Sequence, residues 1–440
     1  MYRSNMSSKR GAIDEFRISI FTLRESRVNG TQRVVRGLGR KLRAESAAAA
    51  MVICLVLLSA TRRSEAQNWI ATWAAAANPE PQSLTLPAEG LTLRQKIRIS
   101  HGGEFLRVKI SNEAGLDSLS VGQVTIAVDH APKDSLEAIR TLSFSGRQSF
   151  VIPPGALAVS DPVKMTLPSL SRLSISIFIP DQTIQVWTRH PLGLETNAAA
   201  PGNQTTQMSL DSSRAITSSY FLKAVDVECD GDCGAIVALG DSITDGQGST
   251  IDADARWPDV LASRLASDPK TKGLSIINEG ISGNRLLHDG RGPSLLSRLD
   301  RDVLSQSGVR YLIVLIGIND IGRATRARDP ADPVSVADLA WGLSQVAERA
   351  HEKGVKVYVA TLTPAGHGSV SGEALRSGLN DWIRDSKLFD GVIDFDAMVK
   401  DPQHPTRMLP AYDSGDSLHP GDQGYGKMGS SIDLNSFLSK

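Results

Sequence analysis

The stretch that decides the fold is VALGDSITDG, residues 237–246, in which an apolar run ends in Gly-Asp-Ser. Residues 236–239 are continuously apolar, as in a strand buried on both faces, and Gly240 permits a sharp turn directly after it. Ser242 is then either a nucleophile presented at the end of a buried strand or the cap of the next helix. The rest of the chain has to decide between these two interpretations.

The segment from residue 235 onward alternates between strand-like and helix-like stretches. The strand-like runs are 236–239, 274–278, 311–317, 355–362 and 391–395. The helix-like stretches between them include WPDVLASRLAS at 257–267 and VADLAWGLSQVAERAHEKG at 336–354. This alternation predicts an α/β domain over residues 235–440, with a parallel sheet and helices on both faces. Ligands of such sheets bind beyond the carboxyl ends of the strands.

Residues 67–227 follow a different pattern, with a period of two. The stretches LTLRQKIRIS (91–100) and EFLRVKIS (104–111) alternate apolar and basic residues around Gly102-Gly103, which predicts a hairpin with one apolar and one wet face. Short strands without a convincing long helix predict a β-sandwich, jelly-roll-like domain over residues 67–227. Its tryptophans serve packing or, alternatively, a sugar-binding face; they are Trp69, Trp73 and Trp187.

Residues 1–66 have the features of a signal peptide with a long basic leader. An uncharged stretch of 16 residues, 46–61, follows the basic segment. It is shorter than the roughly 20 residues that span a bilayer, but it fits the apolar region of a signal peptide. The small residues Ser-Glu-Ala before Gln67 predict cleavage near Ala66 and a secreted or periplasmic protein. A membrane anchor at 46–61 is the alternative, and a start downstream of Met1 would also explain the long leader.

Composition excludes some classes of protein. The chain has 440 residues, 41% hydrophobic and 22% charged, which is typical of a globular protein with two or three domains. Residues 1–66 hold 13 of the 48 Lys/Arg and 5 of the 48 Asp/Glu, so the remainder has a net charge of −8. That balance gives no support to nucleic-acid binding.

Two of the three cysteines lie close together in the motif ECDGDCG, residues 228–234, and the third, Cys54, lies in the leader. In an oxidising compartment Cys229 and Cys233 can form a small disulfide just before the strand at 236–239. Two cysteines without neighbouring histidines do not make a zinc site. We therefore expect no metal ion and no cofactor.

Polar residues of catalytic type follow the predicted strands. Ser242 follows the first strand, Gly283 in NEGISGN follows the second, and Asn319 in GIND follows the third. Asp416 and His419 lie three residues apart in DSGDSLHP near the C-terminus. Each alone has a structural explanation, as a turn glycine, a helix cap or a loop histidine. Together they supply a nucleophile, two oxyanion donors, a base and an orienting acid, which favours catalysis.

The motifs GDSITDG, GISGN, GIND and DSLHP, in this order and spacing, resemble the four signature blocks of the SGNH (GDSL-type) hydrolase family. The resemblance covers residues 235–440. It implies a flavodoxin-like fold, Ser242 as nucleophile, Gly283 and Asn319 as oxyanion donors, and Asp416 with His419 completing the triad. Ile243 replaces the usual Leu, and Glu279 precedes the glycine of the second block. Residues 67–227 resemble, more weakly, the jelly roll of some secreted carbohydrate acetylesterases.

The chemistry explains why these residue types are needed. A serine hydroxyl becomes nucleophilic when an imidazole takes its proton, and a carboxylate on the same loop can orient that imidazole. Asp413 is a rival orienting acid, three residues further from His419 than Asp416 is, and His288 is a rival base. A conventional α/β-hydrolase is disfavoured, because Thr244 occupies the second glycine of its G-x-S-x-G elbow.

The sequence thus predicts a secreted serine esterase that hydrolyses O-acyl, above all acetyl, esters of polysaccharides. One alternative is a carboxylesterase or lipase for short-chain lipid or small-molecule esters. Another is a carbohydrate-binding surface protein whose hydrolase domain is inert. The complete set of catalytic residue types argues against inertness.

Overall fold

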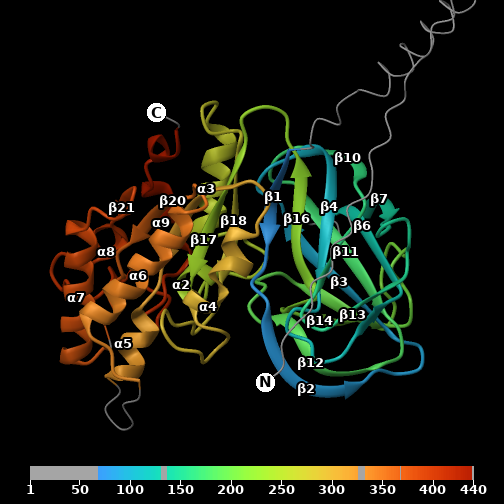
Figure 1. The fold of residues 1–440 in the computed structure, drawn as a ribbon, viewed down its shortest axis with the longest axis horizontal. Helices are drawn as coiled ribbons and strands as arrows, with labels where there is room; N and C mark the ends of the chain where they lie inside the picture. The colour runs from blue at the N-terminus through green and yellow to red at the C-terminus, as the bar shows by residue number, and fades with distance from the viewer. Residues whose placement is uncertain (1–67, 130–135, 326–331, 367, 439–440) are drawn as a thin grey trace, which may run out of the picture. The chain divides into compact units, whose positions relative to one another are not determined.

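The computed structural model describes residues 68–129, 136–325, 332–366 and 368–438. The segment that carries the predicted signal peptide lies outside the described residues. The described chain forms one compact unit in which a strand-rich N-terminal part precedes an α/β part (Figure 1). Among the described helices, none combines the length and the apolar character needed to cross a membrane.

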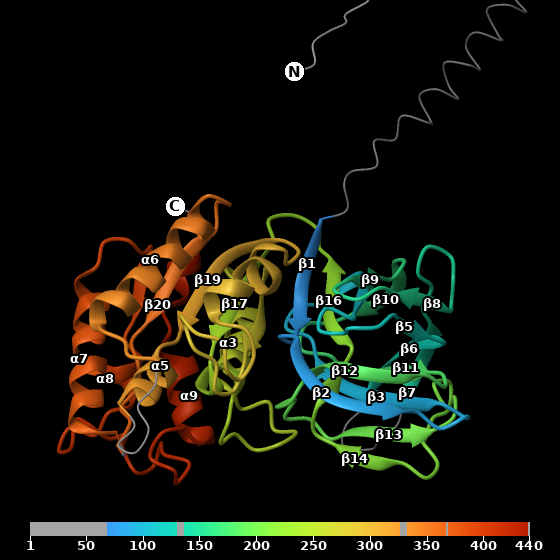
Figure 2. The same ribbon diagram turned by 60° about the horizontal axis from the view of Figure 1, so that its bottom comes forward.

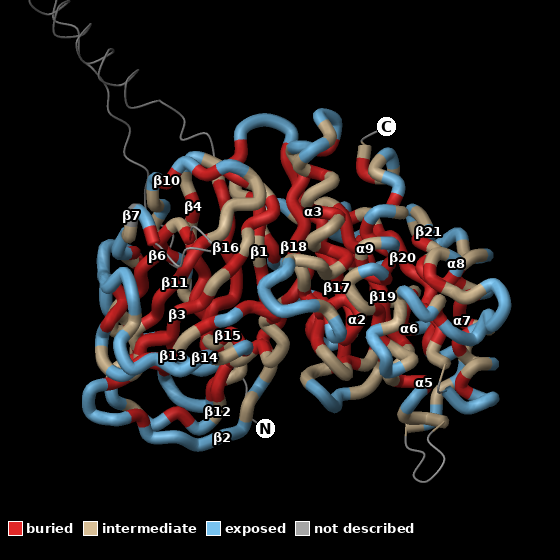
Figure 3. The backbone as a smooth tube through the Cα atoms, turned by 180° about the vertical axis from the view of Figure 1, so that it is seen from behind, coloured by how far each residue is buried: buried red, intermediate tan, exposed pale blue. Residues whose placement is uncertain are grey.

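The α/β part is built on a parallel five-stranded sheet in the order β18-β17-β19-β20-β21. The strands are β17 (Gly234–Gly240), β18 (Leu274–Gly280), β19 (Val309–Leu315), β20 (Lys356–Ala360) and β21 (Gly391–Ile393). The five predicted strands are therefore confirmed. Residues 235–239 of β17 are fully buried between the neighbouring strands and the helices, as their apolar sequence predicts (Figure 3).

Helices cover the sheet on both sides (Figures 1 and 3). They are α2 (Ser242–Asp245), α3 (Trp257–Ser267), α4 (Leu295–Leu299), the π-helical η1 (Asp300–Leu304), α5 (Ile318–Ala324), α6 (Val336–His351), α7 (Val370–Asp385), α8 (Phe395–Val399), α9 (Asp422–Ser431) and the 3₁₀-helical η2 (Leu434–Phe437). Helix α6 begins with a capping box between Ser335 and Asp338. It ends shortly before Gly354, whose positive φ of 72° suits the turn that closes the helix.

The N-terminal part consists of antiparallel strands around a core of its own. One sheet holds β1 (Trp69–Ala74), β16 (Leu222–Glu228), β4 (Gly103–Ser111), β10 (Val163–Leu167) and β9 (Leu157–Val159). A second holds β14 (Arg214–Ile216), β13 (Asn197–Pro201), β3 (Leu91–Arg98), β11 (Arg172–Ile179), β6 (Gln123–Asp129) and β7 (Leu136–Thr141). Smaller sheets pair β15 (Ser219–Tyr220), β12 (Thr183–His190) and β2 (Asn78–Thr85), and β5 (Leu119–Val121) with β8 (Phe150–Ile152). Figure 2 shows β2 and β12 running alongside the two larger sheets.

The predicted hairpin between residues 91–100 and 104–111 is wrong. Strand β3 pairs with β11 and β13, whereas β4 pairs with β16, β9 and β10 in the other sheet. The apolar residues of both strands do face one core, but they reach it from two different sheets. An alternating pattern determines which face of a strand is buried and says nothing about which strand is its partner.

The basic face of β3 is also less exposed than the pattern suggests. The Arg94 side chain is buried and donates to Ser176 Oγ and to the carbonyl oxygens of Gln204, Gln207 and Met208. These bonds replace the water that a guanidinium would lose on burial. A basic residue opposite an apolar face therefore does not by itself mark a solvent-exposed face.

The tryptophan of β12 belongs to the core. Trp187 is 6% exposed, its ring stacks on Phe221 with centroids 5.4 Å apart, and its N–H donates to the carbonyl of Gln82. A buried ring cannot offer a face to a sugar, so Trp187 serves packing. Trp69 instead carries the Arg107 guanidinium over its ring, 4.6 Å from the centroid.

Strand β1 lies along β18, the edge strand of the parallel sheet, and joins the two parts. Ser275 Oγ of β18 donates to the Ala71 carbonyl, and the Ile276 N–H donates to Ser100 Oγ. Ala71 and Ala74 pack into the core of the α/β part. The N-terminal part thereby covers a sheet edge that would otherwise present unpaired backbone groups to solvent.

Gly102 permits the turn that carries the chain from β3 to β4. A Cβ at this position would lie 2.1 Å from the Leu167 carbonyl oxygen, so a side chain would push two backbone segments apart. We expect Gly102→Ala to lower the free energy of unfolding by about 1–3 kcal/mol, as overpacking does. Urea denaturation checks this value, with Gly426→Ala as control because a Cβ there meets nothing within 4 Å. Equal stability of the two variants would contradict the close approach.

Candidate active site

The nucleophile candidate begins the short helix that follows the central strand. Ser242 is the first residue of α2, and its Oγ lies 2.8 Å from Nε2 of His419. Nδ1 of His419 lies 2.6 Å from Oδ2 of Asp416. Because Nδ1 faces a carboxylate, it carries the proton and leaves the lone pair of Nε2 directed at the serine hydroxyl. The three side chains thus form one hydrogen-bonded chain from acid to hydroxyl.

The carboxylate of Asp416 is held in its ionised form. Partial burial of Asp416 would raise its pKa, but hydrogen bonds from the His419 ring and from the backbone N–H groups of His419 and Leu418 lower the pKa to about 2. Asp413, the rival acid, instead accepts two backbone N–H groups of the loop, from Gly415 and Ser417. Asp413 therefore shapes the loop, whereas Asp416 contacts the imidazole.

The loop that carries His419 is fixed against the segment after Ser242. The Tyr425 hydroxyl donates to the Gln247 carbonyl, and Asp422 accepts from Ser249 and Thr250. These contacts join residues more than 170 positions apart in the sequence. They bring the C-terminal histidine to the end of β17.

The two remaining predicted residues line one cavity of about 870 Å³. Gly283 and Asn319 lie in its wall together with Leu418, the neighbour of His419. Gly283 has a φ of 79°, a conformation that favours glycine. The amide nitrogen of Asn319 donates to the Asn284 carbonyl at 3.0 Å, which fixes the side chain and leaves its second N–H for a ligand.

Comparison with known proteins addresses the α/β part. A sequence model of the GDSL-like lipase/acylhydrolase family matches residues 238–427. The chain carries a domain of the GDSL-like lipase/acylhydrolase family. The protein is accordingly a carboxylic ester hydrolase. No functionally curated protein matches the chain.

Several solved structures are similar to a part of the chain. A putative lipolytic protein of the G-D-S-L family from Desulfitobacterium hafniense is 21% identical (TM-score 0.35), and the match covers 44% of this chain and 95% of that one. An aryl esterase from M. smegmatis is 19% identical over 45% and 96% of the two chains (TM-score 0.36). A variant of an acetyl xylan esterase from Geobacillus stearothermophilus is 17% identical over 48% and 97% (TM-score 0.38). The family assignment rests on the sequence model alone, because these TM-scores are low.

Two buried acids hold the loop of the GDSL domain that contains Gly283. Asp245 accepts from both the N–H and the hydroxyl of Ser282, at 2.8 and 2.7 Å. Asp320 accepts from the N–H groups of Leu286 and Leu287. Sequence reasoning missed both roles, although Asp245 and Asp320 stand inside the motifs GDSITDG and GIND. Their position in the motifs was the available signal.

Arg298 is a third support for the GDSL domain that the sequence analysis did not identify. Its guanidinium is 1% exposed and donates to the carbonyls of Gly240 and Glu279 and to Oδ1 of Asn284. These acceptors lie at the ends of β17 and β18 and in the Gly283 loop. One side chain thus ties together the segments that flank Ser242 and Gly283.

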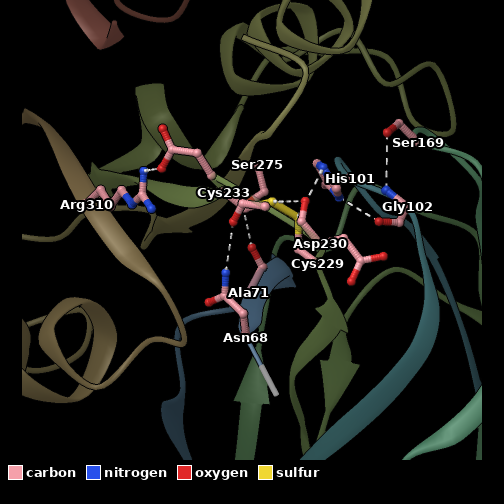
Figure 4. Close-up of a disulfide and its surroundings, with 12 residues drawn as sticks. Asn68, Ala71, His101, Gly102, Ser169, Cys229, Asp230, Cys233, Ser275 and Arg310 are labelled. Atoms are coloured by element: carbon pink, nitrogen blue, oxygen red, sulfur yellow. Dashed lines mark hydrogen bonds and ion pairs between the residues drawn. A yellow bond between two sulfur atoms is a disulfide. The ribbon is translucent and has the colours of Figure 1, made fainter. Parts of the chain in front are cut away.

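Cys229 and Cys233 form a disulfide just before β17, and His101 lies beside it (Figure 4). Nε2 of His101 is 4.0 Å from Cys229 Sγ, and Nδ1 contacts the Gly102 carbonyl. The expectation that the cysteines have no neighbouring histidine is therefore wrong, because the turn after β3 brings His101 to them from far away in the sequence. In the disulfide the sulfurs are not thiolates, which are the metal-binding form of cysteine.

Asp241, directly before Ser242, is a fully buried acid. Its Oδ1 accepts from the Ile243 N–H as the cap of α2, and Oδ2 has no hydrogen-bond partner in the described part of the chain. Burial above all, and then the nearby carboxylates of Asp320 and Asp245, raise its pKa to about 7. Asp241 therefore retains its proton in the folded protein at pH values where the unfolded chain has lost it.

This shift predicts a stability cost that grows with pH. Between about pH 4 and 7 the folded state binds the Asp241 proton and the unfolded state does not, so stability falls by up to about 1.4 kcal/mol per pH unit. Asp241→Asn keeps the cap acceptor and removes the titration. We expect this variant to lose less free energy of unfolding than the wild type between pH 5 and 8, measured by urea denaturation.

The control is Asp433→Asn, the same change at an exposed helix cap. That variant should follow the wild-type pH dependence. If the free energy of unfolding of Asp241→Asn and of the wild type changed equally with pH, Asp241 would be ionised in the folded state throughout this range.

Proposed function

We propose that the protein is a secreted serine esterase that removes O-acyl groups, above all acetyl groups, from polysaccharides. The observation that carries the proposal is the hydrogen-bonded chain from Asp416 through His419 to Ser242. In this proposal Ser242 is the nucleophile, His419 the base and Asp416 the orienting acid. Gly283 and Asn319 donate to the oxyanion. The proposal includes export after cleavage near Ala66.

The geometry supports a two-step acyl transfer. His419 accepts the Ser242 proton as the hydroxyl attacks the ester carbonyl, and the ionised Asp416 stabilises the resulting imidazolium. The carbonyl oxygen becomes an oxyanion, for which the N–H of Gly283, the Asn319 amide and the N–H of Ser242 are the donors. His419 then protonates the leaving alcohol, and water repeats the sequence to release the acid.

The lining of the 870 Å³ cavity favours an alcohol rich in hydroxyl groups over a long acyl chain. Besides Gly283 and Asn319 it contains further glycines, six charged residues and the apolar side chains of Ile318, Ile321, Ala365 and Leu418. The charged residues are Arg285, Arg291, Arg323, Asp332, Glu373 and Arg376. Specific polar groups orient ligands, whereas an acyl chain needs an apolar wall. Hydrolysis of short-chain lipid or small-molecule esters is the second candidate function, supported by the family assignment.

We also infer fold classes finer than those stated above. The strand order β18-β17-β19-β20-β21 supports a flavodoxin-like GDSL domain, because that class has the order 2-1-3-4-5. The two antiparallel sheets around one core support a jelly-roll-like N-terminal domain.

The decisive test of the proposal is Ser242→Ala. The variant should fold normally and lose kcat by about 10⁶-fold, because its side chain cannot form an acyl-enzyme. Rates on acetylated xylan and on p-nitrophenyl esters of increasing chain length measure the loss and also separate the two candidate substrates. Ser267→Ala, at the exposed end of α3, is the matched control and should be fully active. Substantial ester hydrolysis by folded Ser242→Ala would reject the proposal.

The roles of His419 and Asp416 predict a specific pH dependence. The kcat/KM value should rise with pH, since only a neutral imidazole accepts the serine proton. The pKa of about 2 keeps Asp416 ionised, so it should add no inflection above about pH 4. Asp416→Asn should lower kcat by about 10⁴-fold with little change in KM, because an amide favours the wrong imidazole tautomer.

Asp413→Asn is the matched control in the same loop and should keep far more activity. Combining Asp416→Asn with Ser242→Ala should cost little beyond Ser242→Ala, as for groups that act as a unit. A pH profile that is unchanged in His419→Ala would transfer the role of base to another histidine, with His288 the first to examine.

A further inference from the structure

A histidine of the N-terminal part contacts the motif that contains Ser242. His190, the last residue of β12, is 8% exposed, and its Nε2 lies 3.0 Å from Oδ1 of Asp245. Its other nitrogen, Nδ1, lies 3.2 Å from the Ala76 carbonyl oxygen. Asp245 is the last residue of α2, three positions after Ser242. The two parts of the chain therefore meet directly beside the proposed nucleophile.

The contacts of His190 determine its protonation. Both ring nitrogens face oxygen acceptors, so both have to carry protons, and the ring is an imidazolium paired with the Asp245 carboxylate. Burial opposes this charge, but the carboxylate of Asp245 and the Ala76 carbonyl outweigh it and raise the pKa of His190. The pair is a buried, charge-assisted hydrogen bond, a type that is stronger than a neutral one.

The second oxygen of Asp245 continues the contact to the proposed oxyanion hole. Oδ2 accepts from both the N–H and the Oγ–H of Ser282, and Ser282 directly precedes Gly283. A Cβ on Gly280 would lie 2.3 Å from the Asp245 N, so the loop before Ser282 packs tightly on α2. An unbroken hydrogen-bonded path leads from His190 through Asp245 to the residue beside Gly283.

We propose that His190 is a positioning residue for ester hydrolysis, which sets the Gly283 N–H at the oxyanion by orienting Asp245 against Ser282. The inference rests on the proposed function, in which Gly283 stabilises the transition state. Asp245 accepts on both carboxylate oxygens, so a rotation of its side chain breaks the contact to Ser282. Gly283 lines an open cavity, so one side of its loop is not packed, and the hydrogen bonds of Asp245 to Ser282 help to set its position. Misplacement of a catalytic group by about 1 Å can cost about 100-fold in rate.

Two polar substitutions of His190 form a matched pair. In His190→Asn the amide can replace Nδ1 and its contact with Ala76, but it does not reach Asp245. In His190→Gln the longer amide can replace Nε2 and donate to Asp245. We expect kcat of His190→Asn to fall about 100-fold with KM nearly unchanged, and that of His190→Gln to stay near the wild-type value.

Thr188→Val is the control for loss of a hydrogen bond elsewhere in β12. Thr188 is buried two residues before His190, and its Oγ1 accepts from the Ala114 N–H within the N-terminal part. This variant should lose stability but not kcat. All rates are compared at a temperature at which thermal unfolding shows every variant to be folded.

A second readout is the rate at which diethyl p-nitrophenyl phosphate inactivates the protein by reacting covalently with Ser242. This reagent forms a tetrahedral phosphoryl adduct on the serine Oγ with release of p-nitrophenolate, and its phosphoryl oxygen uses the oxyanion donors. The inactivation rate of His190→Asn should fall together with kcat. Asp245→Asn should reproduce the loss, and the double variant should lose no more than the larger single loss, since both act on one path. If His190→Asn does not fold, His190→Met, which has a similar volume and donates to neither oxygen, takes its place in the comparison with His190→Gln.

The outcomes separate the inference from the proposed function. If the reagent inactivates wild-type Ser242 but His190→Asn and His190→Gln have equal kcat and inactivation rates, the positioning role alone is overturned. The same holds if the variants change only KM. It also holds if the losses of His190→Asn and Asp245→Asn add in the double variant. Absence of any adduct on wild-type Ser242 would overturn the proposed function and this inference with it.

Discussion

The arrangement of the candidate active site depends on one buried guanidinium. Arg298 fixes the carboxyl ends of β17 and β18 through the carbonyls of Gly240 and Glu279, and it pairs with Asp302 at 3.0 Å. Asp302 in turn accepts from Lys223 of the N-terminal part at 2.8 Å. Removing one partner of a buried pair typically costs about 3–5 kcal/mol, because an uncompensated charge remains. A change in the position of the strand ends would therefore disturb the contact between the two parts, and a change in that contact would disturb the strand ends.

Glu279 gives physical meaning to a departure from the common family pattern. Its carboxylate is fully buried and contacts both Lys223 and Gln306. Burial raises its pKa, and the nearby Lys223 opposes that shift. The side chain does not contact Ser242 or His419, yet its backbone carbonyl is an acceptor of Arg298. Glu279 thus belongs to the interface between the two parts, where Lys223 is its ion-pair partner.

Local signals were sufficient to predict the parallel sheet and to single out Ser242, Asp416 and His419, which the structure brings into contact. The strands of that sheet are mostly apolar, with β17 apolar throughout between its terminal glycines. Ser242, Asp416 and His419 stand in compact motifs whose order implies a common location. The pairing of β3 and β4 could not be predicted in this way, because one core accepts apolar faces from either of two sheets. The conformation of the loop after β3 decides the partner, and alternation carries no information about it.

The supports of the site were missed for a related reason. His190 and Arg298 are separated in sequence from the residues they contact, and nothing in their own neighbourhoods distinguishes them from other basic residues. His101 beside the disulfide is a similar case, since it lies 128 positions before Cys229. Such contacts arise only when the fold brings distant segments together.

The short connection between the two parts has a consequence for the modularity of the enzyme. Only residues 229–233 separate β16 from β17, and the disulfide closes them into a small ring. Excision of the α/β part would expose β18, an edge strand able to template aggregation. It would also leave the buried carboxylates of Glu279 and Asp302 without their partner Lys223. The N-terminal part is thus not an interchangeable accessory, and transplanting the catalytic half to another scaffold would require the new host to supply an equivalent lysine and an equivalent edge strand.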